Sequence, residues 1–100
     1  MYQDIFPEEL SQWQRKGASL IDVREPYEFE MGHVPGTKNI PLGELSVRIS
    51  EVPDNVVLIC ASGNRSGRAA GFLSQQGYHK VANLMGGTQG WMMRGREIEL

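Results

Sequence analysis

Four consecutive apolar residues, Val56–Ile59 (VVLI), constrain the fold of this chain more than any other feature of its sequence. A strand that is apolar on both faces belongs in the middle of a sheet that is covered on both sides. A turn signal, Pro53-Asp54-Asn55, precedes this segment, and a helical pattern follows it after a short loop. A buried strand that leads directly into a helix is typical of a parallel sheet.

Short apolar segments alternate with polar-faced helical segments along the rest of the chain. We expect strands at residues 2–5, 19–23, 38–40, 56–59 and 81–84, and helices at about residues 7–14, 27–31, 41–49 and 66–76, with a short final helix around Trp91. This alternation predicts an α/β fold with a mainly parallel sheet. The chain has 100 residues and no linker or internal repeat, so we expect one domain spanning residues 1–100.

Composition and charge exclude several classes of function. The net charge is -2, which gives no reason to expect binding to nucleic acid or to an anionic membrane. Residues 1–10 lack the basic start and apolar run of a signal peptide, and the longest apolar run, residues 56–61, is too short to span a membrane. Cys60 is the only cysteine, so no intramolecular disulfide can form, and a lone thiol favours the reducing cytoplasm.

The most informative residue is Cys60, which directly follows the central strand. Ligands of open parallel sheets bind beyond the carboxyl ends of the strands, where we expect Cys60 to lie. The short loop after it predicts an anion-binding nest, because backbone N–H groups and the positive end of the next helix converge there. Gly63 suits a positive φ, Arg65 can grip an oxyanion, and Ser66 is expected to cap the helix. The predicted binding loop consists of Ala61, Ser62, Gly63, Asn64, Arg65 and Ser66.

These loop features predict an activated thiol. They stabilise a thiolate, so the pKa of Cys60 should lie below the value of about 8.5 that a free cysteine has. We expect the charged sulfur to be exposed at the rim of the sheet and to attack an anionic, electrophilic substrate. A single cysteine at the end of an apolar strand can also be an ordinary buried hydrophobe. A core-filling cysteine needs no anion nest after it, so the loop favours the functional interpretation.

Three motifs occur in order along the chain. Residues 22–41 contain Asp-x-Arg, Glu-Phe, Gly-His-Val-x-Gly and Asn-Ile-Pro. The second motif is the loop that begins at Cys60 and ends at Arg65, and the third is Gly-Gly-x-x-x-Trp, which ends at Trp91. With these motifs the sequence resembles the rhodanese homology domain over nearly its whole length.

The resemblance implies a single rhodanese-like domain with three layers, in which helices flank a five-stranded, mainly parallel sheet. It implies a sulfurtransferase in which Cys60 takes sulfane sulfur from a small anionic donor such as thiosulfate and holds it as a persulfide. The sulfur then passes to cyanide, to a thiol or to an acceptor protein, for example a thioredoxin-like one. The loop N–H groups would hold the persulfide, and Arg65 would steer the anion. No metal or organic cofactor is implied.

Four polar residues before the loop could be mistaken for acid–base machinery: Asp22, Arg24, Glu28 and His33. We interpret them as structural support. Arg24 and Glu28 are expected to make ion pairs that hold the loops in place. His33 is expected to brace a turn. Ion-pair networks also perturb ionisable groups without taking part in chemistry, so such a group need not be catalytic.

Two alternatives remain open. Dual-specificity phosphatases share the rhodanese fold and use Cys-x5-Arg, whereas Cys60 and Arg65 are spaced as Cys-x4-Arg. The shorter loop should be too tight for phosphate, which counts against a phosphatase or an arsenate-reductase-like enzyme. The second alternative is a non-catalytic persulfide carrier or regulatory module, and an exposed apolar patch beside the loop would favour such a docking role.

Overall fold

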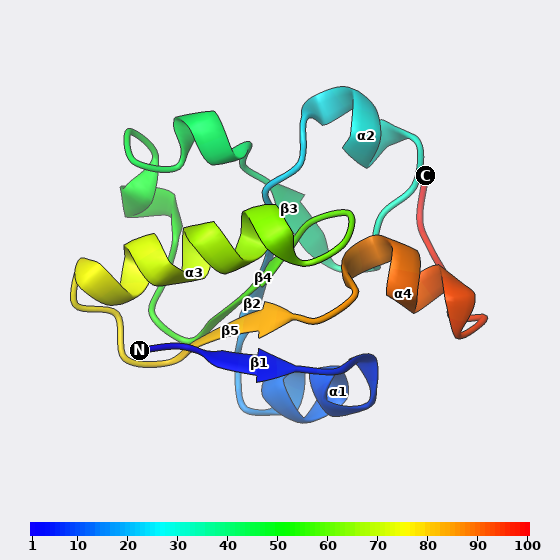
Figure 1. Cartoon of the computed structure of the whole chain (residues 1–100), viewed down its shortest axis with the longest axis horizontal. Helices are drawn as coiled ribbons and strands as arrows, with labels where there is room; N and C mark the ends of the chain where they lie inside the picture. Colours follow the sequence, from blue (N-terminus) through cyan, green and yellow to red (C-terminus); the bar gives the residue numbers. More distant parts are fainter.

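The computed structural model describes residues 1–100 and places all five strands in one sheet, in the order β1-β5-β4-β2-β3 (Figure 1). The strands are β1 (Gln3–Ile5), β2 (Ser19–Asp22), β3 (Thr37–Asn39), β4 (Val56–Ile59) and β5 (Val81–Leu84). The helices are α1 (Pro7–Arg15), α2 (Pro26–Glu30), α3 (Asn64–Gln75) and α4 (Gly87–Met93), with two 3₁₀ turns, η1 (Leu42–Glu44) and η2 (Ile49–Glu51). Every strand pair is parallel, so the predicted α/β class and five-stranded sheet are confirmed.

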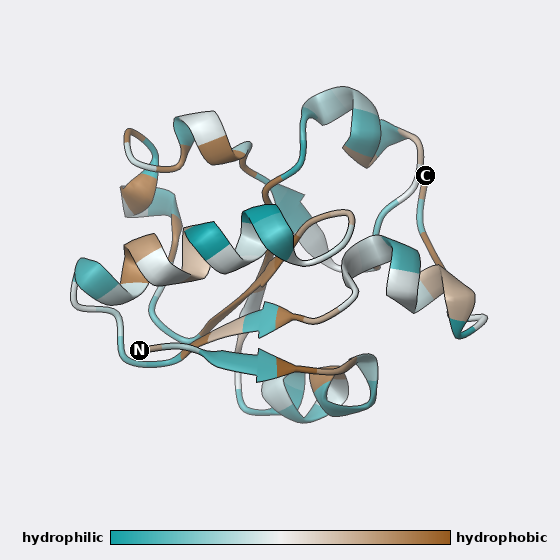
Figure 2. Cartoon of the chain, in the orientation of Figure 1, coloured by the Kyte–Doolittle hydropathy of each residue, from teal (hydrophilic) through white to brown (hydrophobic).

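The central strand β4 divides the core into two layers. Its residues are fully buried, and they alternate between the two faces of the sheet. Val56 and Leu58 pack in a cluster with residues of α3, while Val57 and Ile59 pack with residues of α1 and are joined by Trp91 of α4. Figure 2 shows apolar colouring concentrated in the central part of the sheet. Because the alternation continues past the strand, Cys60 lies on the α3 side.

Residues 41–49 do not form the predicted helix: η1 is followed by a turn at residues 45–48, and η2 begins only at Ile49. The predicted apolar face is correct, since Leu45 is buried and Leu42 and Ile49 pack against the core. Gly43 weakens a helix by about 1 kcal/mol relative to alanine, and short connections commonly close as 3₁₀ turns instead. The other element boundaries differ from the predicted ones by two residues or fewer. No helix is both long and apolar enough to pass through a bilayer.

The last residues of the chain return to the segment after α2. His33 and Glu99 form an antiparallel bridge with two backbone hydrogen bonds of 2.8 Å. A Cβ atom on Gly32 would lie 2.8 Å from the side chain of Ile98, which shows how closely the two segments approach. Figure 1 places the C-terminus beside α2 and away from the N-terminus.

The start of α4 is packed directly against the loop that follows β4. The amide of Thr88 donates to the carbonyl of Cys60 at 2.8 Å, and the amide of Gln89 donates to the carbonyl of Ala61 at 3.0 Å. Gly87 makes this approach possible, because it has φ +58° and a Cβ atom there would lie 2.3 Å from the carbonyl oxygen of Cys60. No side chain fits at position 87 without moving the loop.

We therefore predict that Gly87→Ala is strongly destabilising. The left-handed backbone costs an alanine about 1–2 kcal/mol, and the overlap with the loop adds about 1–3 kcal/mol. Gly95→Ala is the matched control, since Gly95 also has a positive φ (+70°) but has open space around it. Urea denaturation of both variants measures the difference, and equal losses of unfolding free energy would show that α4 is not pressed against the loop.

Candidate active site

Cys60 lies directly after β4 at the carboxyl edge of the sheet, in the place expected from the sequence. The expectation that its sulfur is exposed is wrong, because the residue is only 1% exposed. Cys60 belongs to the apolar cluster that contains Val56 and Leu58, and the loop after it brings the Gly63 amide and the Ser66 hydroxyl to the sulfur.

The sulfur of Cys60 is surrounded by hydrogen-bond donors. The amide of Gly63 lies 3.0 Å from Sγ, and the hydroxyl oxygen of Ser66 lies 3.3 Å from it. Burial raises the pKa of Cys60, but hydrogen bonds from the Ser66 hydroxyl and from the amides of Ser66, Gly63 and Ser62 outweigh it. The pKa of the thiol is therefore held below its ordinary value, as the loop sequence predicted.

The conformation of the loop depends on Gly63. Its φ is +109°, and it stands immediately before the first residue of α3, Asn64. Because α3 begins there, its first turn directs free amides and the positive end of the helix toward the sulfur. Ser66 was expected to cap this helix, but it lies inside the first turn, so its hydroxyl is free to reach the sulfur instead.

Arg65 is not free to meet an incoming anion in this structure. Its guanidinium donates two hydrogen bonds to Glu28 of α2, from Nη1 to Oε1 at 2.8 Å and from Nη2 to Oε2 at 2.9 Å. These hydrogen bonds lower the pKa of Glu28 to about 2, so the carboxylate stays charged. Both side chains are partly exposed, and the pair therefore orients the loop more than it stabilises the fold.

A second, buried ion pair fixes the backbone after β2. The carboxylate of Asp22, which is fully buried, accepts hydrogen bonds from Arg24 Nε at 3.0 Å and Nη2 at 2.8 Å. Arg24 also donates to the carbonyl of Gly32 at 2.9 Å. Arg24 and Glu28 thus each form an ion pair, but with different partners. Asn39 adds two further hydrogen bonds, to the carbonyls of Asp22 and Arg24.

His33 lies among groups that hold its own turn. Its ring stacks on Phe29 with centroids 3.7 Å apart, and its Nδ1 lies 2.9 Å from the carbonyl of Phe29. Its Nε2 is 3.6 Å from a carboxylate oxygen of Glu99. None of these partners is the sulfur or a loop residue, so the geometry offers His33 no route for proton transfer to Cys60.

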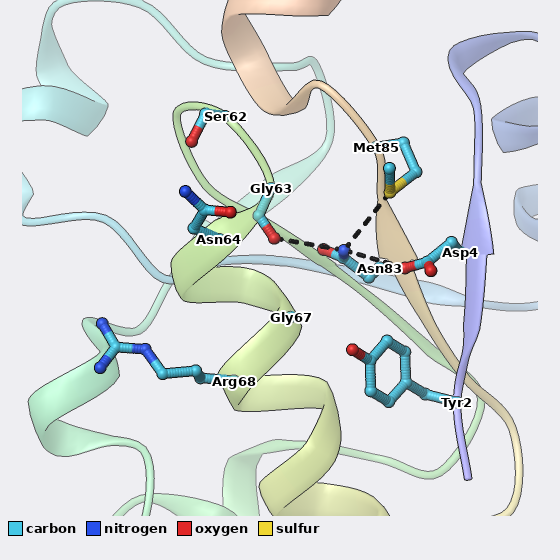
Figure 3. Close-up of a pocket in the computed structure, with 9 residues that line it drawn as sticks. All are labelled: Tyr2, Asp4, Ser62, Gly63, Asn64, Gly67, Arg68, Asn83 and Met85. Carbon is cyan, nitrogen blue, oxygen red and sulfur yellow. Dashed lines mark hydrogen bonds between the residues drawn. The ribbon is translucent and has the colours of Figure 1, made fainter.

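Two open pockets flank the loop. One, of about 270 Å³, lies over Ala61 and is lined by Arg24, Glu28, Met31, Gly32, Ala61, Thr88, Gln89 and Met92. The other, of about 380 Å³, shares no residue with the first and is lined by Tyr2, Asp4, Ser62, Gly63, Asn64, Gly67, Arg68, Asn83 and Met85 (Figure 3). No group of three or more His, Cys, Asp or Glu side chains is arranged to hold a metal ion.

Sequence reasoning missed Asn83, which contacts both Ser66 and Gly63. The only signal was one polar residue within the apolar segment Val81–Leu84. Such a residue at the carboxyl end of a buried strand must find hydrogen-bond partners at the same edge as the active loop.

Together, the fold and the site define a class of protein: an α/β domain that holds one cysteine of lowered pKa among hydrogen-bond donors in a loop between a central strand and a helix. The chain belongs to the rhodanese-like domain family, because the model of the Rhodanese-like domain matches residues 6–94.

Similar proteins agree with this assignment. A sulfurtransferase of Allochromatium vinosum is 38% identical over 102 residues, covering 98% of this chain and 95% of the relative. The thiosulfate sulfurtransferase GlpE of Pseudomonas aeruginosa is 33% identical, covering 90% of this chain and 84% of the relative. The crystal structure of a rhodanese-related protein from Thermoplasma volcanium is 36% identical and superposes with a TM-score of 0.87 over 99% of both chains.

The lowered pKa of Cys60 predicts how alkylation by iodoacetamide depends on pH. The rate should rise with a midpoint below about 8.5, the value of a free cysteine, and fall as acid protonates the thiolate below that midpoint. Ser66→Ala should raise the midpoint by about one unit, because it removes one hydrogen bond to a charged group. Ser74→Ala is the control, since the Ser74 hydroxyl is buried in α3 without a partner. A wild-type midpoint at or above that of free cysteine contradicts the assignment.

Proposed function

We propose that this protein is a sulfurtransferase that carries sulfane sulfur as a persulfide on Cys60, with thiosulfate as a donor. The observation that carries the proposal is the convergence of the Gly63 amide and the Ser66 hydroxyl on the sulfur of a lone cysteine. Sulfurtransferases among its relatives support the reaction class. The proposed unit is the whole rhodanese-like domain, and the proposed compartment is the reducing cytoplasm, which suits a lone thiol.

The proposed reaction has two displacements at sulfur. The Cys60 thiolate attacks the outer sulfur of thiosulfate, the S–S bond of the donor breaks, sulfite leaves, and a Cys60 persulfide anion remains. Cyanide or a thiolate then attacks the terminal sulfur and releases the Cys60 thiolate. The charge stays on sulfur throughout, so the amides of the loop can stabilise each stage, and no general base is needed once the thiolate has formed.

Loop size supports sulfur transfer over phosphate chemistry. The amide of Gly63 already lies 3.0 Å from the cysteine sulfur, which leaves little room between the nucleophile and the nest. A single additional sulfur atom needs less space within this loop than a tetrahedral phosphate group does. The Cys-x4-Arg spacing and the contracted loop therefore disfavour a phosphatase or an arsenate-reductase-like enzyme.

A carrier that delivers sulfur to one protein is a second candidate function. Met31 is 76% exposed and Met92 is 47% exposed, and both line the pocket over Ala61. Exposed methionines beside a buried nucleophile suit a protein acceptor, such as a thioredoxin-like one, since methionine adapts to partner surfaces. In this alternative the persulfide forms on Cys60 but moves only slowly to small acceptors.

We predict that Cys60→Ser abolishes sulfur transfer while leaving the fold intact. Serine is nearly isosteric but has no thiolate to accept sulfane sulfur. Production of thiocyanate from thiosulfate and cyanide measures turnover, and thermal unfolding confirms that the variant is folded. Mass spectrometry of the wild type after incubation with thiosulfate should show one added sulfur on the peptide that contains Cys60.

The outcomes separate the candidate functions. Equal turnover by the wild type and Cys60→Ser removes Cys60 from the mechanism. A wild-type protein that gains one sulfur but does not turn over with cyanide is a carrier. Hydrolysis of p-nitrophenyl phosphate that depends on Cys60, without any added sulfur, contradicts the proposal in favour of a phosphatase.

The Arg65–Glu28 pair leads to a prediction for the KM for thiosulfate. Glu28→Gln removes a carboxylate that occupies Arg65 and repels a dianion, so the KM for thiosulfate should fall by about fivefold, equivalent to ~1 kcal/mol. Arg65→Ala should raise that KM. Glu44→Gln is the matched control, because Glu44 also pairs with an arginine, Arg48, but does not contact the loop. A higher KM in Glu28→Gln would mean that the intact pair itself binds the donor.

A further inference from the structure

Asn83 is a buried polar residue for which the proposed reaction has no role. It stands in β5 among the apolar residues Val81, Ala82 and Leu84, and it is 3% exposed. A buried side-chain amide is costly unless both of its ends have hydrogen-bond partners. The partners of Asn83 therefore show what its presence in the strand achieves.

Both ends of the Asn83 amide are satisfied, and one of its partners comes from the edge strand β1. Its Nδ2 donates to Asp4 Oδ1 at 3.1 Å and to the carbonyl of Gly63 at 3.2 Å (Figure 3). Its Oδ1 accepts a hydrogen bond from the hydroxyl of Ser66. Since the nitrogen end faces two acceptors, the amide has only one favourable orientation, and that orientation turns its oxygen toward Ser66.

The two loop residues that Asn83 contacts both donate hydrogen bonds to the sulfur of Cys60. Gly63 donates its amide to Cys60 Sγ, and Ser66 places its hydroxyl 3.3 Å from the same atom. Asn83 binds the carbonyl of Gly63 and the hydroxyl of Ser66, so one side chain fixes both donors relative to the sulfur. Asp4 in turn fixes Asn83.

The single proton of the Ser66 hydroxyl gives this arrangement a chemical consequence. While Cys60 is a thiol, its S–H can donate to Ser66 Oγ, and Ser66 can donate to Asn83. When Cys60 ionises, the hydroxyl proton turns from Asn83 Oδ1 to the sulfur, and the first turn of α3 keeps Oγ within reach of Sγ. Ser66 can thus serve both protonation states by rotating one O–H bond.

We propose that Asn83, oriented by Asp4, is a positioning residue that keeps the Gly63 amide and the Ser66 hydroxyl directed at Cys60 and so sets the reactivity of the thiol. The network runs from β1 through β5 to the start of α3 and ends at the sulfur. Neither Asn83 nor Asp4 bonds the sulfur itself. The proposal rests on the proposed role of Cys60, but its test measures thiol ionisation, which does not require sulfur transfer.

The test is the pKa of Cys60, measured from thiolate absorbance and from the pH dependence of iodoacetamide alkylation. Asn83→Ala should raise this pKa by about one unit, which makes alkylation near neutral pH up to about tenfold slower. Asn83→Asp should raise it further, because a carboxylate retains the Ser66 proton and repels Asp4. With thiosulfate, kcat should fall while KM changes little, since Asn83 is placed to act on the nucleophile and not on the donor.

Variants of Asp4 separate orientation from general stability. Asp4→Asn keeps an acceptor for Asn83 Nδ2 and should behave nearly as the wild type, whereas Asp4→Leu removes it and should raise the pKa of Cys60. Asp54→Ala is the control, because Asp54 accepts hydrogen bonds from the amides of His79 and Lys80 and does not touch the loop. It should lower the unfolding temperature without changing that pKa.

The pKa of Cys60 in Asn83→Ala decides whether the proposal holds. If Asn83→Ala leaves the pKa of Cys60 unchanged or lowers it, Asn83 does not direct the donors to the sulfur and serves only to join strands. If the pKa responds as expected but the wild type transfers no sulfur, the positioning network stands and the proposed reaction fails.

Discussion

The structure depends on one requirement, which is that a negative charge on a buried sulfur must be met by donors. An ionised thiol with 1% exposure is unfavourable unless hydrogen bonds replace the water it has lost. Here the loop divides its peptide groups: amides point inward to Cys60, while the carbonyls of Cys60 and Ala61 point outward and are bound by the first amides of α4. The packing of α4 therefore helps to fix the loop around the sulfur, although α4 follows the loop by more than twenty residues.

Two ion pairs fix the surroundings of the loop, one in contact with it and one farther away. Glu28 binds Arg65 with two hydrogen bonds and so ties the first turn of α3 to α2. The buried Asp22–Arg24 pair anchors the backbone from which α2 begins, and thereby places Glu28. The carboxylates of Asp22 and Glu28 thus hold arginine side chains in place, and neither forms a hydrogen bond with the Cys60 sulfur.

The fold and the cysteine loop could be predicted because they follow from local patterns. The VVLI segment has no polar face, Gly63 permits a positive φ, and Cys60 follows the strand without a gap. The 3₁₀ turns, the burial of Cys60, the pairing of Arg65 with Glu28 and the hydrogen bonds of Asn83 could not be predicted in this way. Each depends on residues brought together from distant parts of the chain. In residues 41–49 the spacing of apolar residues correctly predicted which side chains are buried, but not that the backbone forms a 3₁₀ turn in place of an α-helix.

The pairing of His33 with Glu99 has a practical consequence for protein engineering. The C-terminal residues lie along the segment after α2, next to Gly32, which lines the pocket over Ala61. A fluorescent label or affinity tag attached at this end would begin beside the pocket over Ala61 and would crowd it. The fully exposed Met1 lies far from the C-terminus, so immobilising the protein through Met1 leaves the pocket over Ala61 open.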